Sequence, residues 1–575
     1  MLVIQSSIVY YPHMPSIVGK RRGKRTYYYL VESARVEGQP RIVSQQYLGT
    51  GEEVMAKLSG APAGEPVRSQ HKRFGDLAAV WSVLARLDVA GIVDEVAPRY
   101  ANAAASVGTY LALATANRIV DPCSKLAFAD WWATTAGPRW VRLPDGALDH
   151  RRFWDAMDCL GEDDLRRIET DLGRRMVSEF GLDLSGLVLD MTNFATYIDS
   201  ANDRAPIAQR GKAKQKRTDL RLVGLALVVT RDGGVPVVSH AYPGDRPDVT
   251  QFSTVIDELV SRYRQLTTSV ESLTVVYDAG QNSADNHATV EASGLGFVGS
   301  LPPSDHPDLL ALPRSRYNPV DADRYPGLTC VDTHVTALGV TRRAVLTHSP
   351  TLHAAQSRGF DQTLAKARAR LAELQARLAR GKTRRARAAV EADIATIVKP
   401  RWVSQVITTT LSGEDPADLR LSWRIDTRAR ARLERRQFGK RILFTNRDHW
   451  TPADVVAAYR SQSEVESGFR QQKDPHVVSF SPMHHWTDSK IRVHVFYCVL
   501  ALAIAHLMRR HAEHAGLHMS VRELLTELAG IGETVLLYHD GGKGRPRARR
   551  MLTDMTPTQQ HLAELFDIHH YAPTR

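Results

Sequence analysis

The chain has 575 residues, which is too long for one hydrophobic core, so several domains are expected. Hydrophobic residues make up 43% of it and charged residues 24%, as in an ordinary soluble protein. The 75 Lys and Arg against 63 Asp and Glu give a formal charge of +12, which favours a polyanionic partner, most often nucleic acid.

Other features of the whole chain argue against secretion, zinc binding and a membrane. The four cysteines lie far apart without CxxC spacing, so neither a disulfide framework nor a zinc ribbon is predicted. The N-terminus lacks a basic region followed by an apolar one, so no signal peptide is expected. The longest apolar run, residues 495–508, is shorter than the roughly 20 residues that a span needs. It is predicted to be a buried core helix in a cytoplasmic protein.

The first 180 residues divide into a strand-rich part and a helical part. Residues 26–36 and 40–49 are rich in β-branched and aromatic side chains and flank a short polar turn, which indicates a β-hairpin. From Phe74 onward apolar residues recur at spacings of three and four, the helical period. A DNA-binding module and a structural bundle are both open interpretations of this helical part.

From about residue 181 short apolar runs replace the helical period. The pattern predicts three strands, a helix, a fourth strand, then a short helix and a further strand-like run, which is a mixed α/β arrangement. A tight turn at Asp232, Gly233 and Gly234 separates the second and third strands. The predicted strands and first helix cover residues 184–194, 220–230, 234–243, 248–266 and 271–280.

Two acids lie near the ends of the first and fourth of these strands. Asp190 and Asp278 each lie at the end of an apolar run, where an Asp is often only a turn former or a helix cap. If the two strands are neighbours, however, the carboxylates meet at one edge of the sheet. Their repulsion must then be offset by a cation, so the pair indicates a cation site.

Residues from about 303 to 436 look inserted into this domain. Leucines at 364, 371, 374 and 378 and apolar residues at 390, 394 and 397 form two seams, which predict a helical hairpin. Its outer positions carry many basic residues, for which a solvated face and phosphate contact are both open. These residues are Lys366, Arg368, Arg370, Arg377, Arg380, Lys382, Arg384, Arg385 and Arg387.

The α/β pattern resumes with a strand at 440–446 and a helix beginning at Thr451 and Pro452. The stretch YRSQSEVESGFRQQK, residues 459–473, is predicted to be one helix that carries Tyr459, Glu466 and Lys473 on one face, because they recur every seven residues. Packed across the sheet, Glu466 would add a third carboxylate to a site for two Mg²⁺ ions, suited to phosphodiester chemistry.

These residues resemble a known family. The strand order with the three acids resembles the RNase H-like DDE transposases, and Tyr459, Glu466 and Lys473 at their spacing are similar to the signature of the IS4 group of bacterial insertion sequences. The family pattern has an arginine three residues after the tyrosine, where this chain has Gln462. Further stretches resemble the IS1634 branch: VESARVEGQPRIVSQQYLG, RIVDPCSKLAFADWW, GKAKQKRTDLRLVGLALVV, YPGDRPDVTQF and VYDAGQNS.

The resemblance, which spans about residues 26–510, implies an α/β fold: an RNase H-like catalytic core of mixed sheet and helices, interrupted by a large insertion, with N-terminal β-hairpin and helical domains. The expected domains are a strand-rich region, a helical and DNA-binding domain, the first part of the core, the insertion, the second part of the core with the catalytic helix, and a basic helical C-terminal region. Their expected bounds are 1–70, 71–180, 181–302, 303–436, 437–510 and 511–575.

The implied activity is cut-and-paste DNA transposition, with Asp190, Asp278 and Glu466 as catalytic residues that hold two Mg²⁺ ions, for which Mn²⁺ can substitute. A metal-activated water would cleave at the element end, and the freed 3′-hydroxyl would attack the opposite strand or the target DNA. The implied partners are double-stranded DNA, as terminal inverted repeats and target, and a second copy of the chain. The expected DNA contacts are Tyr459, Lys473, Arg470, Arg460, Lys212, Lys214, Lys216 and Arg217.

Two alternative functions stay open. A nuclease of the same fold that cuts without joining would share the three acids. A transposase-derived DNA-binding protein that no longer cuts is favoured by Gln462 and opposed by the intact acids. No phosphate-binding GxxxxGK[ST] loop occurs, so the use of ATP is not indicated.

Overall fold

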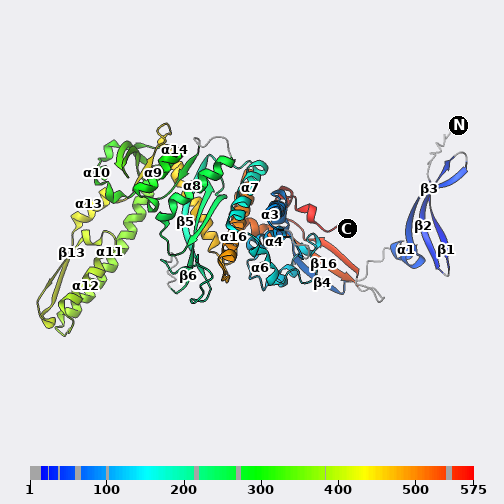
Figure 1. Cartoon of the computed structure of the whole chain (residues 1–575), viewed down its shortest axis with the longest axis horizontal. Coiled ribbons are helices and arrows are strands. Elements are labelled where there is room, and N and C mark those ends of the chain that lie inside the picture. The colour runs from blue at the N-terminus through cyan, green and yellow to red at the C-terminus, as the bar shows by residue number, and fades with distance from the viewer. Residues whose placement is uncertain are drawn as a thin grey trace, which may run out of the picture. The chain divides into compact units, whose positions relative to one another are not determined.

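The computed structural model describes residues 14–23, 25–36, 39–58, 66–98, 103–212, 219–266, 273–382, 384–538 and 547–574. The chain forms two compact units, whose elements are labelled in Figure 1. One unit comprises Met1–Lys72, Gly532–Asp554 and Ala572–Arg575, and the other comprises Arg73–Ile531 and Met555–Tyr571.

The first unit contains two small antiparallel sheets. The predicted hairpin forms between β2 (Arg25–Val36) and β3 (Gln39–Thr50), with β1 (Met14–Arg22) as a third strand and α1 (Gly51–Leu58) after it. The other sheet has the order β17-β16-β4 and contains β4 (Arg68–Arg73), β16 (Gly532–Tyr538) and β17 (Arg547–Leu552).

The prediction that residues 511–575 are helical is therefore wrong in part. Helices α17 (Val521–Ala529) and α18 (Pro557–Leu565) form, but a β-hairpin separates them. The hairpin pairs with β4, more than 450 residues earlier in the chain, and it buries Glu533 in an ion pair with Arg550. A local pattern cannot reveal such a distant partner.

The helical part begins the second unit, as the spacing after Phe74 predicts. Its helices pack around aromatic residues, and Phe128 lies 4.7 Å from Phe153 between ring centroids. They are α2 (Gly75–Arg86), α3 (Val89–Val96), α4 (Val107–Val120), α5 (Phe128–Thr134), α6 (His150–Asp158) and α7 (Glu162–Phe180).

A nine-stranded mixed sheet forms the centre of this unit, so the predicted mixed α/β fold is confirmed (Figure 1). Its order is β10-β11-β12-β15-β9-β8-β5-β6-β7, and β5, β8 and β9 run parallel to one another. The strands are β5 (Gly186–Thr196), β6 (Arg221–Thr230), β7 (Pro236–Pro243), β8 (Thr274–Val276), β9 (Gly296–Leu301), β10 (Asn318–Pro319), β11 (Thr329–Ala337), β12 (Val340–His348) and β15 (Lys440–Thr445).

Helices connect and cover these strands. Between β7 and β8 the chain forms α8 (Asp248–Leu266), and between β8 and β9 it forms α9 (Ala284–Ser293). After β15 come α14 (Pro452–Arg460), α15 (Gln462–Gln472) and α16 (Asp488–His514). Helix α16 is long and apolar enough to cross a membrane, but 94% of its apolar stretch is buried in the protein. It is a core helix, as predicted.

The segment between β9 and β15 contributes in two ways. Strands β10, β11 and β12 extend the central sheet, because β12 pairs with β15 and β15 pairs with β9. The rest, residues 350–436, is named here the helical arm. It contains α11 (Pro350–Ala379), α12 (Arg387–Val398), the pair β13 (Ile407–Ser412) and β14 (Arg420–Ile425), and α13 (Thr427–Gln437).

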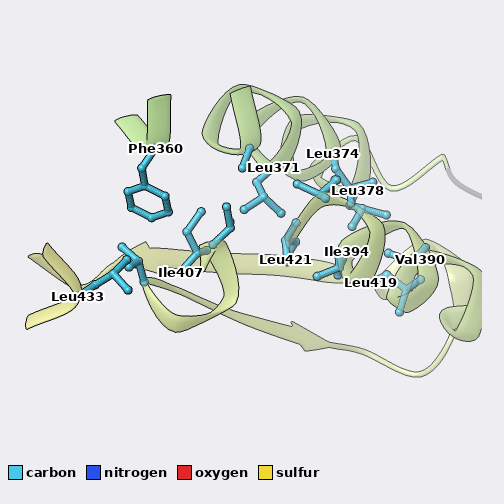
Figure 2. Close-up of a cluster of buried hydrophobic side chains, with 14 of the residues drawn as sticks. Phe360, Leu371, Leu374, Leu378, Val390, Ile394, Ile407, Leu419, Leu421 and Leu433 are labelled. Carbon is cyan, nitrogen blue, oxygen red and sulfur yellow. The ribbon is translucent and has the colours of Figure 1, made fainter. Parts of the chain in front are cut away.

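The helical arm has a hydrophobic core of its own (Figure 2). The two predicted apolar seams both enter this core, since Leu371, Leu374 and Leu378 of α11 and Val390, Ile394 and Ile397 of α12 are all buried in it. Side chains of β13 and β14 close the other side of this core. The predicted helical hairpin therefore exists, and it packs on a two-stranded sheet that the sequence pattern did not predict.

Candidate active site

Asp190, within β5, and Asp278, just after β8, occupy neighbouring positions on two adjacent inner strands of the central sheet. Strands β5 and β8 are parallel neighbours, and Val188 is paired with Val276. Two residues after this pair come Asp190, still within β5, and Asp278, just past the end of β8, so the two aspartates continue the same register. Neighbouring strands are only about 4.8 Å apart. The strands are in this place because their apolar residues, such as Leu187 and Val275, are fully buried. The strands that carry the two acids are therefore neighbours, which is the condition that the sequence left open.

Asp278 is held by two hydroxyl groups. Oγ of Ser300, on the adjacent strand β9, donates to Oδ1 of Asp278 at 2.8 Å, and the hydroxyl of Tyr459 donates to the same oxygen at 3.0 Å. Neither bond uses Oδ2. Burial raises the pKa of Tyr459, so its phenol keeps the proton that it donates. These contacts fix the orientation of the Asp278 carboxylate.

Sequence reasoning missed two residues of this site. Ser300 was hidden in an apolar strand-like run, where one small polar residue gives little signal. Arg441 lies in β15 with its guanidinium carbon 5.0 Å from the centre of the Tyr459 ring. Its only trace in the sequence is a charge within an apolar strand. The pairing of β9 with β15 brings both residues to the site, and the sequence does not reveal this pairing.

Lys473 marks the other end of the site. Residues alternate between the two faces of a strand, so Thr192 and Phe194 share the face of β5 that carries Asp190. Nζ of Lys473 donates to Oγ1 of Thr192 at 2.7 Å and lies 5.6 Å from the centre of the Phe194 ring. Phe194 in turn stacks on Phe480, with ring centroids 4.0 Å apart. Lys473 therefore lies over the aspartate-bearing face of β5.

The single helix predicted for residues 459–473 is interrupted at Ser461, which ends α14 and precedes α15. The hydroxyl of Ser461 donates to the carbonyl of Ala458 at 2.5 Å, a local bond that competes with the helical ladder. The backbone of Ser461 stays in the helical region, with φ of −65° and ψ of −7°. The interruption is slight, and Tyr459 and Lys473 still both reach the same sheet.

Glu466 lies midway between these two contacts, on α15. Its side chain is exposed, while the neighbouring Val465 and Phe469 are buried against the protein. Helix α15 packs on β5. The structure thus places Glu466 on a helix that packs on β5, the strand of Asp190, with buried apolar residues beside it that fix the helix.

The carboxylates of the site are suitable ligands for a divalent cation, but they do not form a complete metal site in this structure. Carboxylate oxygens are the ligands that hard divalent cations prefer, and Asp190 and Asp278 are in register. Among the residues that the structure describes, however, no group of three or more His, Cys, Asp or Glu could hold a metal ion. Two of the three proposed ligands are therefore assembled, and the third is carried by α15.

The other predicted DNA contacts have different positions. Arg460 points to Tyr325, with its guanidinium carbon 4.5 Å from the ring centre, and Arg470 is exposed on α15. The carbonyl of the exposed Lys212 accepts a bond from Asn193, whose side chain lies on the face of β5 opposite to Asp190. Lys214, Lys216 and Arg217 lie outside the described residues.

A motif from the helical part contacts the loop between α15 and α16, which contains Phe480. In the stretch RIVDPCSKLAFADWW, Arg118 is 1% exposed and donates to the carbonyl of Ser481 at 2.9 Å and to that of Cys123. Lys125 is buried, its Nζ lies 4.5 Å from the centre of the Tyr497 ring, and burial lowers its pKa to about 7. Arg118 thus anchors the loop that follows α15, and Lys125 packs against α16.

Comparisons with known proteins identify the family. The family model described as the transposase DDE domain matches residues 182–504, which is more than half of the chain. A cryo-EM structure of the piggyBac transposase synaptic complex with hairpin DNA is similar at 9% identity, over 80% of this chain and 82% of that chain, with a TM-score of 0.37. That similarity is too low to support an argument. No curated protein matched significantly.

The matched range includes β5 with Asp190, β8 followed by Asp278, and α15 with Glu466. The chain therefore belongs to the transposase DDE domain family, and it is a DDE transposase.

Proposed function

We propose that this protein cleaves the ends of an insertion sequence and transfers the freed 3′-hydroxyl ends to target DNA by phosphodiester transesterification. The observation that carries the proposal is the register of β5 and β8, which places Asp190 beside Asp278 within the matched domain. The order β7-β6-β5-β8-β9, three antiparallel strands followed by two parallel ones, supports an RNase H-like core.

The proposed ligands of the divalent metal are Asp190, Asp278 and Glu466, with Mg²⁺ as the expected ion and Mn²⁺ as a substitute. When bound, such ions supply positive charge to the attacking and leaving oxygens of the phosphodiester. Tyr459 and Ser300 orient the Asp278 carboxylate through Oδ1, which keeps Oδ2 out of both bonds. This fixed orientation is what the chain itself contributes to ligand binding.

Lys473 is the basic group best positioned for a phosphate beside the cleaved bond. Its Nζ lies over β5, where it donates to the neutral hydroxyl of Thr192, two residues from Asp190. An ammonium group there would attract and orient a phosphate without taking part in the bond changes. Arg470 is exposed on the same helix and would extend this contact, and the exposed Lys212 is proposed as a separate DNA contact. The hydroxyl of Tyr459 donates to Asp278, so it is not assigned to a phosphate here.

The partners and the finer classification follow from the same proposal. Double-stranded DNA is the substrate, as element ends and as target, and a homodimer assembles on it because two ends must be cut. The IS4 group and its IS1634 branch are proposed from the spacing of Tyr459, Glu466 and Lys473 and from the further stretches that resemble the branch. We also propose that the protein acts in the bacterial cytoplasm, on the nucleoid.

The test uses the purified full chain, Mg²⁺ and a labelled duplex that carries both ends of the DNA flanking the coding sequence. Cleavage at those ends with joining to a target plasmid is expected for the wild type, and Asp190→Asn should bind the duplex without cutting it. The amide keeps the shape of the side chain and removes its charge. Undiminished cleavage by Asp190→Asn would refute the assignment of this carboxylate.

The same assay separates the two alternative functions. Cleavage without strand-transfer products would identify a nuclease. Tight binding without any cut would identify a DNA-binding descendant, the alternative that Gln462 favours. Gln462 is the first residue of α15 and is partly buried, one turn before Glu466. A Gln462→Arg variant that gains cleavage would show that this position limits activity.

A further inference from the structure

Most of the net positive charge of the chain comes from the helical arm. Residues 350–436 contain 19 Lys and Arg against 9 Asp and Glu, so this segment supplies +10 of the formal +12. The arm is also folded around its own core, as Figure 2 shows, so that its charges are carried by a defined scaffold. Net charge anywhere on the surface would keep the chain soluble, so solubility does not explain why the charge is concentrated on one folded segment.

Four of these cations form a stripe along α11. Lys366, Arg370, Arg377 and Arg380 follow one another at intervals of four, seven and three residues, so they share one face of the helix. All four are exposed. A neighbouring face, with Ala367, Leu371, Leu374 and Leu378, is buried in the core of the arm. From Lys366 to Arg380 the stripe is about 21 Å long.

The stripe lies on a helix that begins beside the candidate active site. A cavity of about 190 Å³ is lined by Ser349 and Leu352, at the start of α11, and by Arg441, Tyr459 and Arg460. Tyr459 also donates its hydrogen bond to Asp278. Helix α11 therefore starts at the rim of the site and continues for 30 residues, or about 45 Å. That length corresponds to about 13 base pairs of duplex DNA.

The chemistry of the surface favours a polyanion over a protein partner. Among the described residues of the arm, no large apolar side chain is exposed. A protein interface usually has an apolar or aromatic centre, which this surface lacks. Within the stripe, Arg377 makes an ion pair of 3.2 Å with Glu373, and both side chains are more than half exposed, so the pair is weak.

We infer that the stripe of Lys366, Arg370, Arg377 and Arg380 binds the sugar-phosphate backbone of the duplex that flanks the cleaved bond. The inference rests on the proposed function, because it takes duplex DNA at Asp190 and Asp278 as its starting point. The helical arm then acts as a positioning surface: it adds affinity that is independent of sequence and holds the duplex in line with the site.

The test measures duplex binding in an Asp190→Asn background, so that cleavage does not disturb the equilibrium. The stripe variant K366Q/R370Q/R377Q/R380Q is compared with the control R428Q/R432Q/R435Q/R436Q, which removes the same charge from α13, another surface of the arm. The dissociation constant is measured over a range of salt concentrations for a long duplex and for one trimmed to a few base pairs beside the cleavage point.

The stripe variant should bind the long duplex at least tenfold more weakly, and the slope of log K against log salt should fall by about 0.9 for each phosphate that the protein no longer neutralises. The trimmed duplex should bind as before, and the control should change little. An unchanged slope in the stripe variant would overturn the inference, as would an equally weakened control, because that result indicates diffuse attraction.

Further measurements control for the folding of the variants and for the proposed cleavage activity. Unfolding curves show whether each variant is folded, and R370K/R377K/R380K, which keeps the charge, should keep most of the binding. Cleavage by the wild-type chain is measured independently. If the wild type does not cut but the stripe effect is present, the proposed function fails and the arm still binds DNA; if it cuts and the effect is absent, only the arm inference fails.

Discussion

The hydroxyl of Tyr459 donates a 3.0 Å hydrogen bond to Oδ1 of Asp278, although 181 residues separate the two in the chain. This contact joins helix α14 to the end of β8, and it fixes the carboxylate from the side of the covering helices. The orientation of a proposed metal ligand therefore depends on a residue of a different element.

Replacing Tyr459 by Phe removes the bond and keeps the ring, so the Asp278 carboxylate should become free to rotate. A hydrogen bond of this kind contributes about 0.5–1.5 kcal/mol, which corresponds to a roughly three- to tenfold lower rate of cleavage. The rate is measured in a single turnover at saturating DNA. The affinity for DNA should stay unchanged, and a variant that cleaves normally but binds DNA less tightly would instead indicate a phosphate contact.

Asp278→Asn should lower the affinity for Mn²⁺ more than Ser300→Ala does. The amide removes the charge of a proposed ligand, whereas loss of the Ser300 hydroxyl removes one of two bonds to Oδ1 and leaves the charge in place. Isothermal titration with Mn²⁺ checks the order. Equal affinities in Asp278→Asn and the wild type would show that this carboxylate is not a ligand.

Lys473→Gln should weaken cleavage, while Lys473→Arg should retain most of it. The ammonium lies over β5, where Nζ donates to the Thr192 hydroxyl, and a positive charge at this place is the feature that a bound phosphate would use. Cleavage rates at low and high salt report on this, because the difference between the Gln and Arg variants should shrink as salt screens the phosphate. A Gln variant as active as the wild type at low salt would contradict the role.

Lys125→Met should stabilise the protein at pH 6 and do so less at pH 9. Burial lowers the pKa of Lys125 to about 7, and its Nζ has no hydrogen-bond partner among the described residues. Between pH 7 and about 10 the unfolded chain holds a proton that the folded chain has released, so wild-type stability rises with pH in this window. Below pH 7 Lys125 stays charged in the folded protein, so the substitution by Met raises the free energy of unfolding most there.

Urea unfolding of the wild type and Lys125→Met at both pH values gives the comparison. The expected difference in the gain is at least about 1 kcal/mol. An equal effect of the substitution at pH 6 and pH 9 would show that Lys125 keeps its charge throughout, held by the Tyr497 ring.

Leu371→Ala should destabilise the helical arm. Leu371 is fully buried between α11 and the two-stranded sheet, as Figure 2 shows, and the loss of such a side chain costs about 2–5 kcal/mol. Hydrogen exchange should show faster exchange in α11, α12 and β14, with little change in β5 and β8. Uniform acceleration through both regions would mean that the arm does not unfold separately from the sheet.

Local physical chemistry made much of this protein predictable from its sequence. Strands β5, β6 and β7 and helix α8 follow from uninterrupted apolar runs and from apolar residues at helical spacing, which the main chain converts directly into buried elements. Asp190 and Asp278 stood out because each lies at the end of an apolar run, and Glu466 because it shares a helical spacing with Tyr459 and Lys473. The seams of α11 and α12 likewise predicted the hairpin of the arm.

Long-range pairing decided the rest. The register that sets Asp190 beside Asp278, the bond from Ser300, the ring of Tyr459 beside Arg441 and the pairing of β16 with β4 all join residues that are remote in the chain. No local pattern encodes such a partner, because a strand satisfies its backbone hydrogen bonds equally well with any neighbour that fits. The sequence by itself determined which groups are available for chemistry, and the tertiary structure alone determined which of them meet.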